Sequence, residues 1–386
     1  MKRLSLFLAA AFLAACGGAS QKTTVDLLSA SAPSYDAVAM DVTSADAVAP
    51  ALSEAVTPAD LSELAGIQAA VAEDPCHPHL FVRTHDTARR VNRHLWHALR
   101  HVALAMKGNP VQVGESATWD KVGPAIERKF TITRTGDTTY TWTLELKKLT
   151  DAAFTTVTTG DVDRQDATKP GEGSGHVSID LTKLASVTGQ DVAGTLAFTF
   201  SSLAGTRTVV ADAKDVIWDT DALSAVKAAP RSTHQVYTHE KGKGGSLLVD
   251  EDMVFACPSN PSLLPADVSL VSRWYRTAAG AVHGRSDALM VNGQLPSHQI
   301  DRVVGVTCHA SPEEGSSDFA ESYWLMKAED AAGATIVGAS HEVNGTDASA
   351  CDPQFGAVPV LADGSKDFDF SKIDFTGSTP YPFPGM

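Results

Sequence analysis

The stretch YTWTLEL, residues 140–146, alternates large apolar side chains with polar ones at every position. On an extended chain one side would carry the apolar residues Tyr140, Trp142, Leu144 and Leu146. Successive side chains of a strand point to opposite faces, so this period of two is typical of a strand with one face on a core and the other in water. The stretch therefore predicts an amphipathic strand of an antiparallel sheet.

The same alternation recurs in FTITRT (130–135), LAFTF (196–200) and IDRVVGVTCHA (300–310). In the last stretch one side would carry Ile300, Arg302, Val304, Val306 and Cys308. Glycine-containing turns separate the stretches and no helix recurs between them, which favours a meander over a doubly wound α/β fold. We predict a mainly β protein with a large curved sheet of about ten strands, half-barrel or sandwich-like, because so wide a sheet must curl or split.

One long amphipathic helix is predicted before the sheet, over residues 81–107. Its apolar stripe consists of Ala88, Val91, Leu95, Ala98, Leu99, Val102 and Met106. This stripe is of the kind that packs on a core. The opposite face carries Arg89, Arg90, Arg93 and Arg100. These arginines predict either ion pairs with acidic groups of the sheet or contact with anionic lipid headgroups or an acidic partner.

Three histidines, His94, His97 and His101, lie on one shoulder of this helix, between the two faces. His97 and His101 have the HxxxH spacing that can bind one metal ion, but Ala98 stands where HExxH has its glutamate. The alternatives are a metal or catalytic site and a packed, amphipathic helix edge. A second candidate metal site is CHPH, with Cys76, His77 and His79, whose alternative is a disulfide cysteine beside exposed histidines.

The N-terminal stretch MKRLSLFLAAAFLAACGGAS has the layout of a signal peptide over residues 1–15. Its segment LAAC, residues 13–16, resembles the lipobox of bacterial lipoproteins. The resemblance covers only about the first twenty residues and implies cleavage before Cys16 and lipidation of that cysteine. Gly17 in place of aspartate implies sorting to the outer membrane. No later stretch has the length of apolar sequence that a membrane helix needs.

Export to an oxidising compartment predicts two disulfides among the remaining cysteines. We favour Cys308 with Cys351 and Cys76 with Cys257, while Cys257 with Cys308 stays open. The chain has 386 residues and a net charge of −15, which argues against general nucleic-acid binding.

The domain boundaries follow from composition. Residues 16–75 are rich in Ala, Ser and Asp and predict a lipid-anchored tether with a possible short helix. Residues 76–375 form a single β-rich domain that includes the helix 81–107, and residues 376–386 form a proline-rich tail. Within the domain, residues 160–175 predict an acidic, glycine-rich loop.

The sequence predicts a non-enzymatic, lipid-anchored envelope protein without a cofactor, since it has no GxSxG elbow, P-loop or GxGxxG turn. A curved sheet with a helix is loosely similar to periplasmic half-barrels that carry lipids. In that alternative Trp142, Phe198 and Phe200 would line a cavity rather than form a dry core against the helix. The remaining alternative is a metal-binding protein or enzyme that uses His94, His97 and His101.

Overall fold

The computed structural model describes residues 26–33, 35–40, 42, 80–164, 172–217, 230–253, 266–278, 280–291, 302–311, 320–329 and 335–342. Several predictions fall outside this set: the signal peptide, Cys16, the metal candidate Cys76, His77 and His79, the cysteines Cys257 and Cys351, and the tail 376–386. The structure reports nothing on them.

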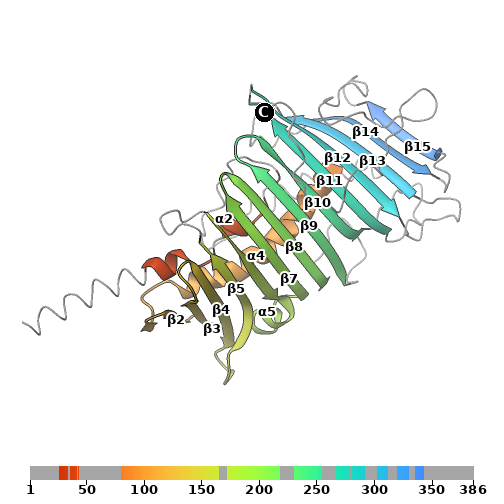
Figure 1. The fold of residues 1–386 in the computed structure, drawn as a ribbon. Coiled ribbons are helices and arrows are strands. Elements are labelled where there is room, and N and C mark those ends of the chain that lie inside the picture. Colours follow the sequence, from red (N-terminus) through yellow and green to blue (C-terminus); the bar gives the residue numbers. More distant parts are fainter. Residues whose placement is uncertain are drawn as a thin grey trace, which may run out of the picture. The chain divides into compact units, whose positions relative to one another are not determined.

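The described residues form fifteen strands and several helices (Figure 1). The strands are β1 (Gln112–Val113), β2 (Ser116–Val122), β3 (Ile126–Arg134), β4 (Thr139–Lys148), β5 (Thr155–Asp163), β6 (Gly173–Asp180), β7 (Ala193–Leu203), β8 (Thr206–Ile217), β9 (Arg231–Glu240), β10 (Gly244–Met253), β11 (Ala266–Arg276), β12 (Val282–Val291), β13 (Arg302–Ser311), β14 (Ala320–Glu329) and β15 (Thr335–Glu342). The helices include α2 (Tyr35–Val38), α4 (Leu80–Ala105) and α5 (Leu181–Thr188).

The fold class is confirmed: the protein is mainly β, and its strands form an open antiparallel meander that is not closed into a barrel. Within each unit consecutive strands pair, as β3 does with β4 and β10 with β11. The predicted helix 81–107 corresponds to α4. There are more strands than the ten predicted because some, such as β12 with the sequence VHGRSDALMV, lack a clean alternation of apolar and polar residues.

The chain divides into two compact units, where the sequence predicted a single domain over residues 76–375. Unit 1 contains residues 1–38 and 94–204, and unit 2 contains residues 39–93 and 205–386. The backbone therefore passes from one unit to the other three times, once within α4. This interleaving is why no change of composition marks a boundary.

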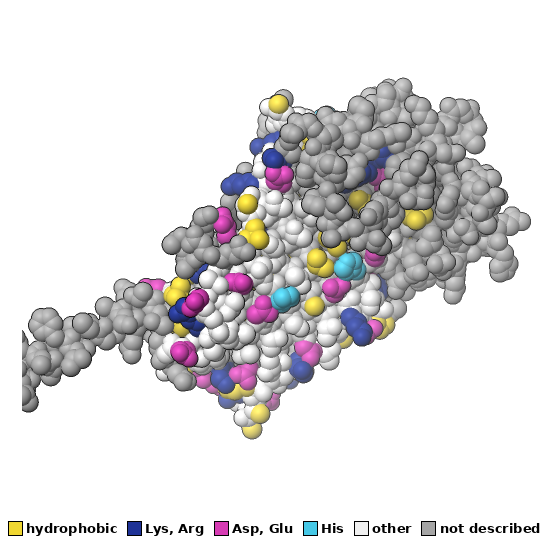
Figure 2. Space-filling view, in the orientation of Figure 1, with side chains coloured by type: hydrophobic (Ala, Val, Ile, Leu, Met, Phe, Trp, Pro, Cys, Tyr) yellow, Lys and Arg dark blue, Asp and Glu magenta, His cyan; other side chains and the backbone are white. Residues whose placement is uncertain are grey.

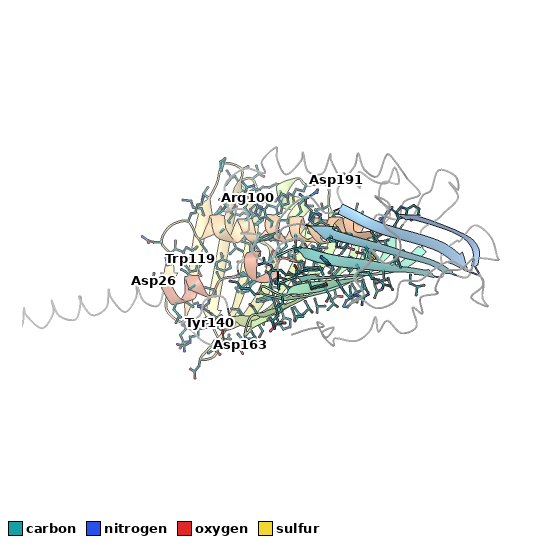
Figure 3. All side chains as sticks on the ribbon, turned by 90° about the horizontal axis from the view of Figure 1, so that it is seen from above. Asp26, Arg100, Trp119, Tyr140, Asp163 and Asp191 are labelled. Carbon is teal, nitrogen blue, oxygen red and sulfur yellow. The ribbon has the colours of Figure 1, made fainter. Side chains whose placement is uncertain are left out.

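Unit 1 has its core on the side of the sheet that carries the large apolar residues of β2 to β7. Trp119, Phe130 and Trp142 follow one another across β2, β3 and β4, with ring centroids 5.9 Å and 6.2 Å apart. The buried residues of α4 in this unit include Leu95, Ala98, Leu99 and Val102, which belong to the predicted apolar stripe. The labelled Trp119 and Tyr140 of Figure 3 are each 2% exposed, so these large side chains stabilise the unit by removing apolar area from water.

Helix α5 packs on another part of this core. Both of its ends are capped by residues whose types favour capping. The Asp180 carboxylate accepts a hydrogen bond from the Lys183 backbone N–H at 2.9 Å, which satisfies one of the N–H groups left open at a helix start. Gly189 ends the helix in the left-handed conformation with φ of 78°. Between the caps, Leu181, Leu184 and Val187 are buried.

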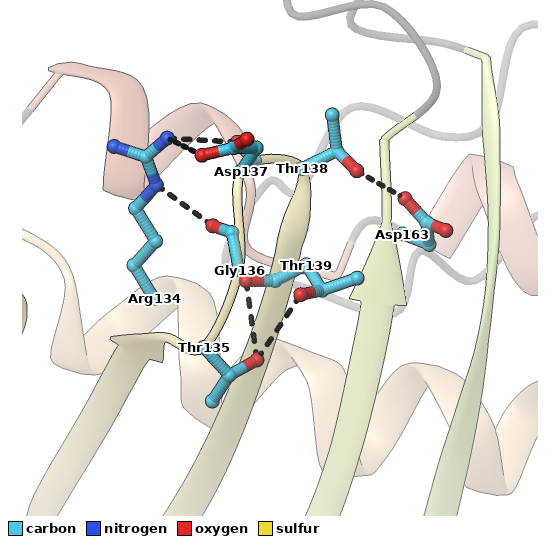
Figure 4. A network of polar contacts seen from close by, with 7 residues as sticks. All are labelled: Arg134, Thr135, Gly136, Asp137, Thr138, Thr139 and Asp163. Carbon is cyan, nitrogen blue, oxygen red and sulfur yellow. Dashed lines mark hydrogen bonds and ion pairs between the residues drawn. The ribbon is translucent and has the colours of Figure 1, made fainter.

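The turn between β3 and β4 is held by side chains (Figure 4). Arg134 donates through Nε to the Gly136 carbonyl and through Nη2 to the Asp137 carbonyl, both at 2.9 Å. Thr138 donates through Oγ1 to Asp163 at the end of β5, at 2.7 Å. The turn is thereby connected to a strand that is not part of the hairpin.

The predicted loop 160–175 is wrong at both ends, because β5 extends to Asp163 and β6 begins at Gly173. Gly160 and Gly175 are strand residues, and an aromatic side chain from a neighbouring strand lies over each of them. Glycine in a strand often marks such a close approach, and composition alone cannot separate it from glycine in a loop.

In unit 2 the N-terminal part of α4 packs on β11 and β13. Thr84 Oγ1 lies 2.6 Å from Ser272 Oγ, and the Phe81 ring centroid lies 3.9 Å from that of His309. Both interactions join segments far apart in the sequence. They fix the helix on the sheet with one polar and one aromatic contact.

Part of the predicted tether 16–75 is packed on the body. In unit 1, Leu28 and Val38 are at most 1% exposed. In unit 2, Asn92 brackets the backbone of Met40: its Oδ1 accepts from Met40 N at 2.9 Å and its Nδ2 donates to Met40 O at 2.6 Å. Composition alone did not reveal this, because the contacts depend on partners in α4 and the sheet.

Among the described residues, no helix combines the length and the apolar character that crossing a membrane requires.

Candidate functional site

The three helix histidines have different surroundings. His94 is buried at 6% exposure, whereas His97 and His101 are half-buried. His97 Nδ1 lies 3.4 Å from Gln190 Nε2, and His101 Nδ1 accepts a hydrogen bond from Arg128 Nε at 3.0 Å. The accepting Nδ1 requires a neutral His101 ring with its proton on Nε2.

Electrostatics agrees with a neutral ring. Burial first, and then the charges of Arg128 and Arg100, lower the pKa of His101 to about 3. Among the residues that the structure describes, no group of three or more His, Cys, Asp or Glu side chains could hold a metal ion. The hypothesis that His94, His97 and His101 form a metal site therefore gains no support, and His101 is engaged by an arginine.

The arginines of α4 do not form one solvent-facing stripe. Arg90 Nη2 lies 3.8 Å from Glu251 Oε1, and that glutamate side chain is 1% exposed. The Arg100 guanidinium lies 5.1 Å from the centroid of the Trp96 ring. Arg93 is exposed, while Arg89 is half-buried. Of the two alternatives predicted for these arginines, Arg90 therefore follows the first, an ion pair with an acidic group of the sheet.

The three residues predicted to line a cavity are all buried: Trp142 and Phe198 are each 2% exposed and Phe200 is 5% exposed. Trp142 lies over Gly160, and Phe200 lies over Gly175. Each ring therefore contacts the backbone of the adjacent strand. The cavity remains a prediction.

Cys308 is disulfide-bonded, in agreement with the expectation of disulfides. Its partner, and with it the choice between Cys351 and Cys257, lies outside the described residues.

Two groups of residues were missed by sequence reasoning. The first is a row of buried hydroxyl groups in unit 2. Ser272 Oγ lies 2.6 Å from Thr84 Oγ1 and 2.5 Å from Ser286 Oγ on β12. Thr307 follows opposite Ser286 on β13, and its buried Oγ1 has no hydrogen-bond partner among the described residues. The four side chains are fully buried, so this row lies within the packed interior.

The second group covers the outer side of the sheet in unit 1 and is named here the hydroxyl face. Cross-strand pairing gives two adjacent rows over β2 to β7. One row is Ser116, Thr133, Thr141, Asp161, His176 and Thr199; the other is Thr118, Thr131, Thr143, Thr159, Ser178 and Ala197. Nine of these twelve residues carry a hydroxyl group, and all twelve are half-buried or exposed.

The hydroxyl face is ordered by cross-strand contacts. Ser116 Oγ lies 2.8 Å from Thr133 Oγ1, and Thr118 Oγ1 lies 3.2 Å from Thr131 Oγ1. His176 Nδ1 lies 3.0 Å from Asp161 Oδ1. Figure 2 shows a sheet face on which uncharged polar side chains and backbone, drawn white, predominate over scattered charges. Such a surface offers hydrogen-bond donors and acceptors with little net charge.

The alternation of apolar and polar residues in β4 already indicated this face, because it places Thr141 and Thr143 on the side opposite the core residues. What the sequence did not give is the register that aligns such residues over neighbouring strands. Comparison with known proteins adds no further guide, since no protein family, curated protein or solved structure matches this chain.

Proposed function

We propose that this chain is a lipid-anchored protein of the cell envelope, held at the outer membrane through Cys16, with a non-enzymatic body. The body acts as a binding or structural module, and the hydroxyl face is its contact surface. The observation that carries the proposal is the alignment of nine hydroxyl-bearing residues over six strands. The opposite side of the same strands supplies the buried core, so the hydroxyl face is the side open to a partner.

The chemistry of this face favours an uncharged, polyhydroxylated partner, such as a polysaccharide of the envelope. Hydroxyl groups both donate and accept hydrogen bonds, and they match sugar hydroxyls without needing an ion. A nucleic acid or strongly acidic partner would call for a basic surface, and these rows contain only the pair Asp161 and His176 as ionisable groups.

The binding test is cosedimentation of the protein with purified peptidoglycan sacculi. Replacing Thr141 or Thr199 with Lys places a long charged side chain on the hydroxyl face and should reduce the bound fraction several-fold. Ser186→Lys, an equal change at an exposed residue of α5, is the matched control and should bind like the unchanged protein. Equal binding by all three variants, or none by the unchanged protein, would remove the polysaccharide proposal.

The anchor is tested separately. Cys16→Ser should move the protein from the membrane fraction to the soluble fraction, because removal of the acyl chains removes the anchoring energy of about 0.8 kcal/mol per buried methylene. Retention of Cys16→Ser in membranes would contradict lipid anchoring and leave the binding test unaffected.

The alternative of a carrier for lipids or other hydrophobic ligands is supported less. Trp142 and Phe200 lie on glycines of adjacent strands, and the Phe130 and Trp142 ring centroids are 6.2 Å apart, which is packing of the dry-core type. Solvent extraction of the purified protein followed by mass spectrometry checks this alternative, because a carrier would release a stoichiometric, non-covalently bound lipid, whereas a lipid on Cys16 would stay attached.

A further inference from the structure

Arg164 is a buried cation at the end of β5. Its side chain is 4% exposed. Nη1 donates to Ser31 Oγ at 3.2 Å, and the backbone N–H donates to the Thr138 carbonyl at 3.0 Å. Ser31 Oγ donates its own proton to the Leu27 carbonyl at 2.8 Å, so it serves as an acceptor for Arg164. Every one of these partners is neutral.

The positive charge of Arg164 has no acidic counterpart among the residues that the structure describes. Nη2 is buried and has no hydrogen-bond partner in the part of the chain that the structure describes. The carboxylate adjacent in sequence, Asp163, accepts from Thr138 Oγ1 instead (Figure 4). An arginine cannot shed its proton inside a protein, and a buried charge without a partner strongly destabilises the folded state. The position therefore calls for an anion.

We propose that Arg164 binds a small oxyanion, a phosphate or carboxylate group, beside Ser31. The guanidinium is planar and its two terminal nitrogens present parallel N–H groups that match two oxygens of such an anion. The anion can be a free ion or the end group of a larger molecule, such as the phosphate of a lipid headgroup. In either case it neutralises Arg164 and ties residues 26–31 to the end of β5.

The first experiment measures thermal unfolding of the full chain carrying Cys16→Ser, with phosphate, acetate or chloride at equal ionic strength and pH. A bound anion raises the unfolding midpoint progressively with its concentration. We expect such a rise with phosphate or acetate but not with chloride. Arg164→Met should abolish the rise, whereas Arg93→Met, which removes an exposed arginine, should preserve it.

A second measurement does not depend on the variant being stable. Equilibrium dialysis of the Cys16→Ser chain against radiolabelled phosphate or acetate should show one anion bound per chain, and Arg164→Lys should bind it at least several-fold more weakly. Vesicles of phosphatidylglycerol, compared with neutral vesicles, identify a headgroup as the source if they bind the protein where free anions do not. Failure of phosphate, acetate and vesicles alike to bind the unchanged protein, or equal binding by Arg164→Lys, overturns the proposal.

Discussion

The indole of Trp142 lies across Gly160, its direct partner on β5, so that a Cβ at position 160 would collide with its ring atom Cζ2. The same relation recurs at three other cross-strand pairs: Phe200 over Gly175, Trp274 over Gly245 and His309 over Gly284. Two pairs lie in each unit. In every case the ring of the neighbour occupies space that a Cβ would need, and at Gly160, Gly175 and Gly245 a backbone carbonyl oxygen of the strand on the other side does so too.

Gly160→Ala is expected to destabilise unit 1 by about 1–3 kcal/mol, because the added methyl group would collide both with the buried indole of Trp142 and with the backbone carbonyl oxygen of His176. Chemical denaturation measures the change in the free energy of unfolding. Gly114→Ala, where no atom lies within 4 Å of the added methyl group, is the matched control and should be nearly neutral. The cost should shrink without vanishing when Trp142 is also replaced by Ala, because the His176 carbonyl oxygen remains in place. An unchanged cost in that background would show that the indole makes no contribution to it.

Replacement of two hydroxyl groups in the same buried row of unit 2 should have opposite outcomes. Ser272→Ala removes the group that contacts both Thr84 and Ser286 and should cost about 1–3 kcal/mol. Thr307→Val removes a buried hydroxyl that has no partner among the residues described and should be neutral or stabilising. Unfolding curves of the two variants provide the comparison, and a more damaging effect of Thr307→Val would show that its hydroxyl is bonded.

Leu95→Asp should destabilise unit 1 by at least several kcal/mol, since Leu95 is 0% exposed and the new carboxylate would be buried without a partner. Arg93→Asp changes an exposed residue of the same helix and serves as the control. Equal stability of the two variants, measured by urea denaturation, would mean that α4 is not docked through its apolar stripe.

Stability should fall as the pH is lowered from about 6.5 towards 3. Burial followed by the Arg128 charge lowers the pKa of His101 to about 3, and burial followed by the charge of His283 lowers the pKa of His309 to about 3. Between these values and the ordinary pKa near 6.5, the unfolded chain binds protons that the folded protein does not, so acid favours unfolding. Above pH 6.5 both rings are neutral in either state and contribute no slope.

The measurement is the free energy of unfolding as a function of pH for the unchanged protein and for His309→Phe. The phenylalanine variant cannot be protonated and should show a smaller loss of stability below pH 6.5. An identical pH profile for the two proteins would contradict the assignment of a neutral, buried His309.

Sequence reasoning predicted those strands and helices in which one face is apolar and the opposite face is polar. The alternation around Trp142 indicated both a strand and its buried side, and the stripe that includes Leu95 indicated the docked side of the helix. In β13 the alternation does not predict which residues are buried. Val306 and Cys308 are buried on the expected side, but Thr307 and His309 on the other side are equally buried.

A strand covered on both faces shows no contrast that a period of two can detect. The polar residues of such strands are also set by distant partners: Thr84 meets Ser272 across 188 positions of the chain. The hydroxyl face has the same origin, since its individual threonines are visible in the sequence while their alignment depends on the register of six strands. Arg164 was missed because the residue that accepts from it, Ser31, lies in a segment predicted to be a tether.

The packing of residues 26–42 limits how far the body can stand from a bilayer. Asp26, the first residue that the structure describes, lies ten positions after Cys16, and ten residues of fully extended chain reach about 35 Å at most. With acyl chains on Cys16, the short connecting segment would keep unit 1 within about one protein diameter of the lipid surface. A partner in a more distant layer of the envelope would have to come to the membrane, because this protein could not swing out to meet it.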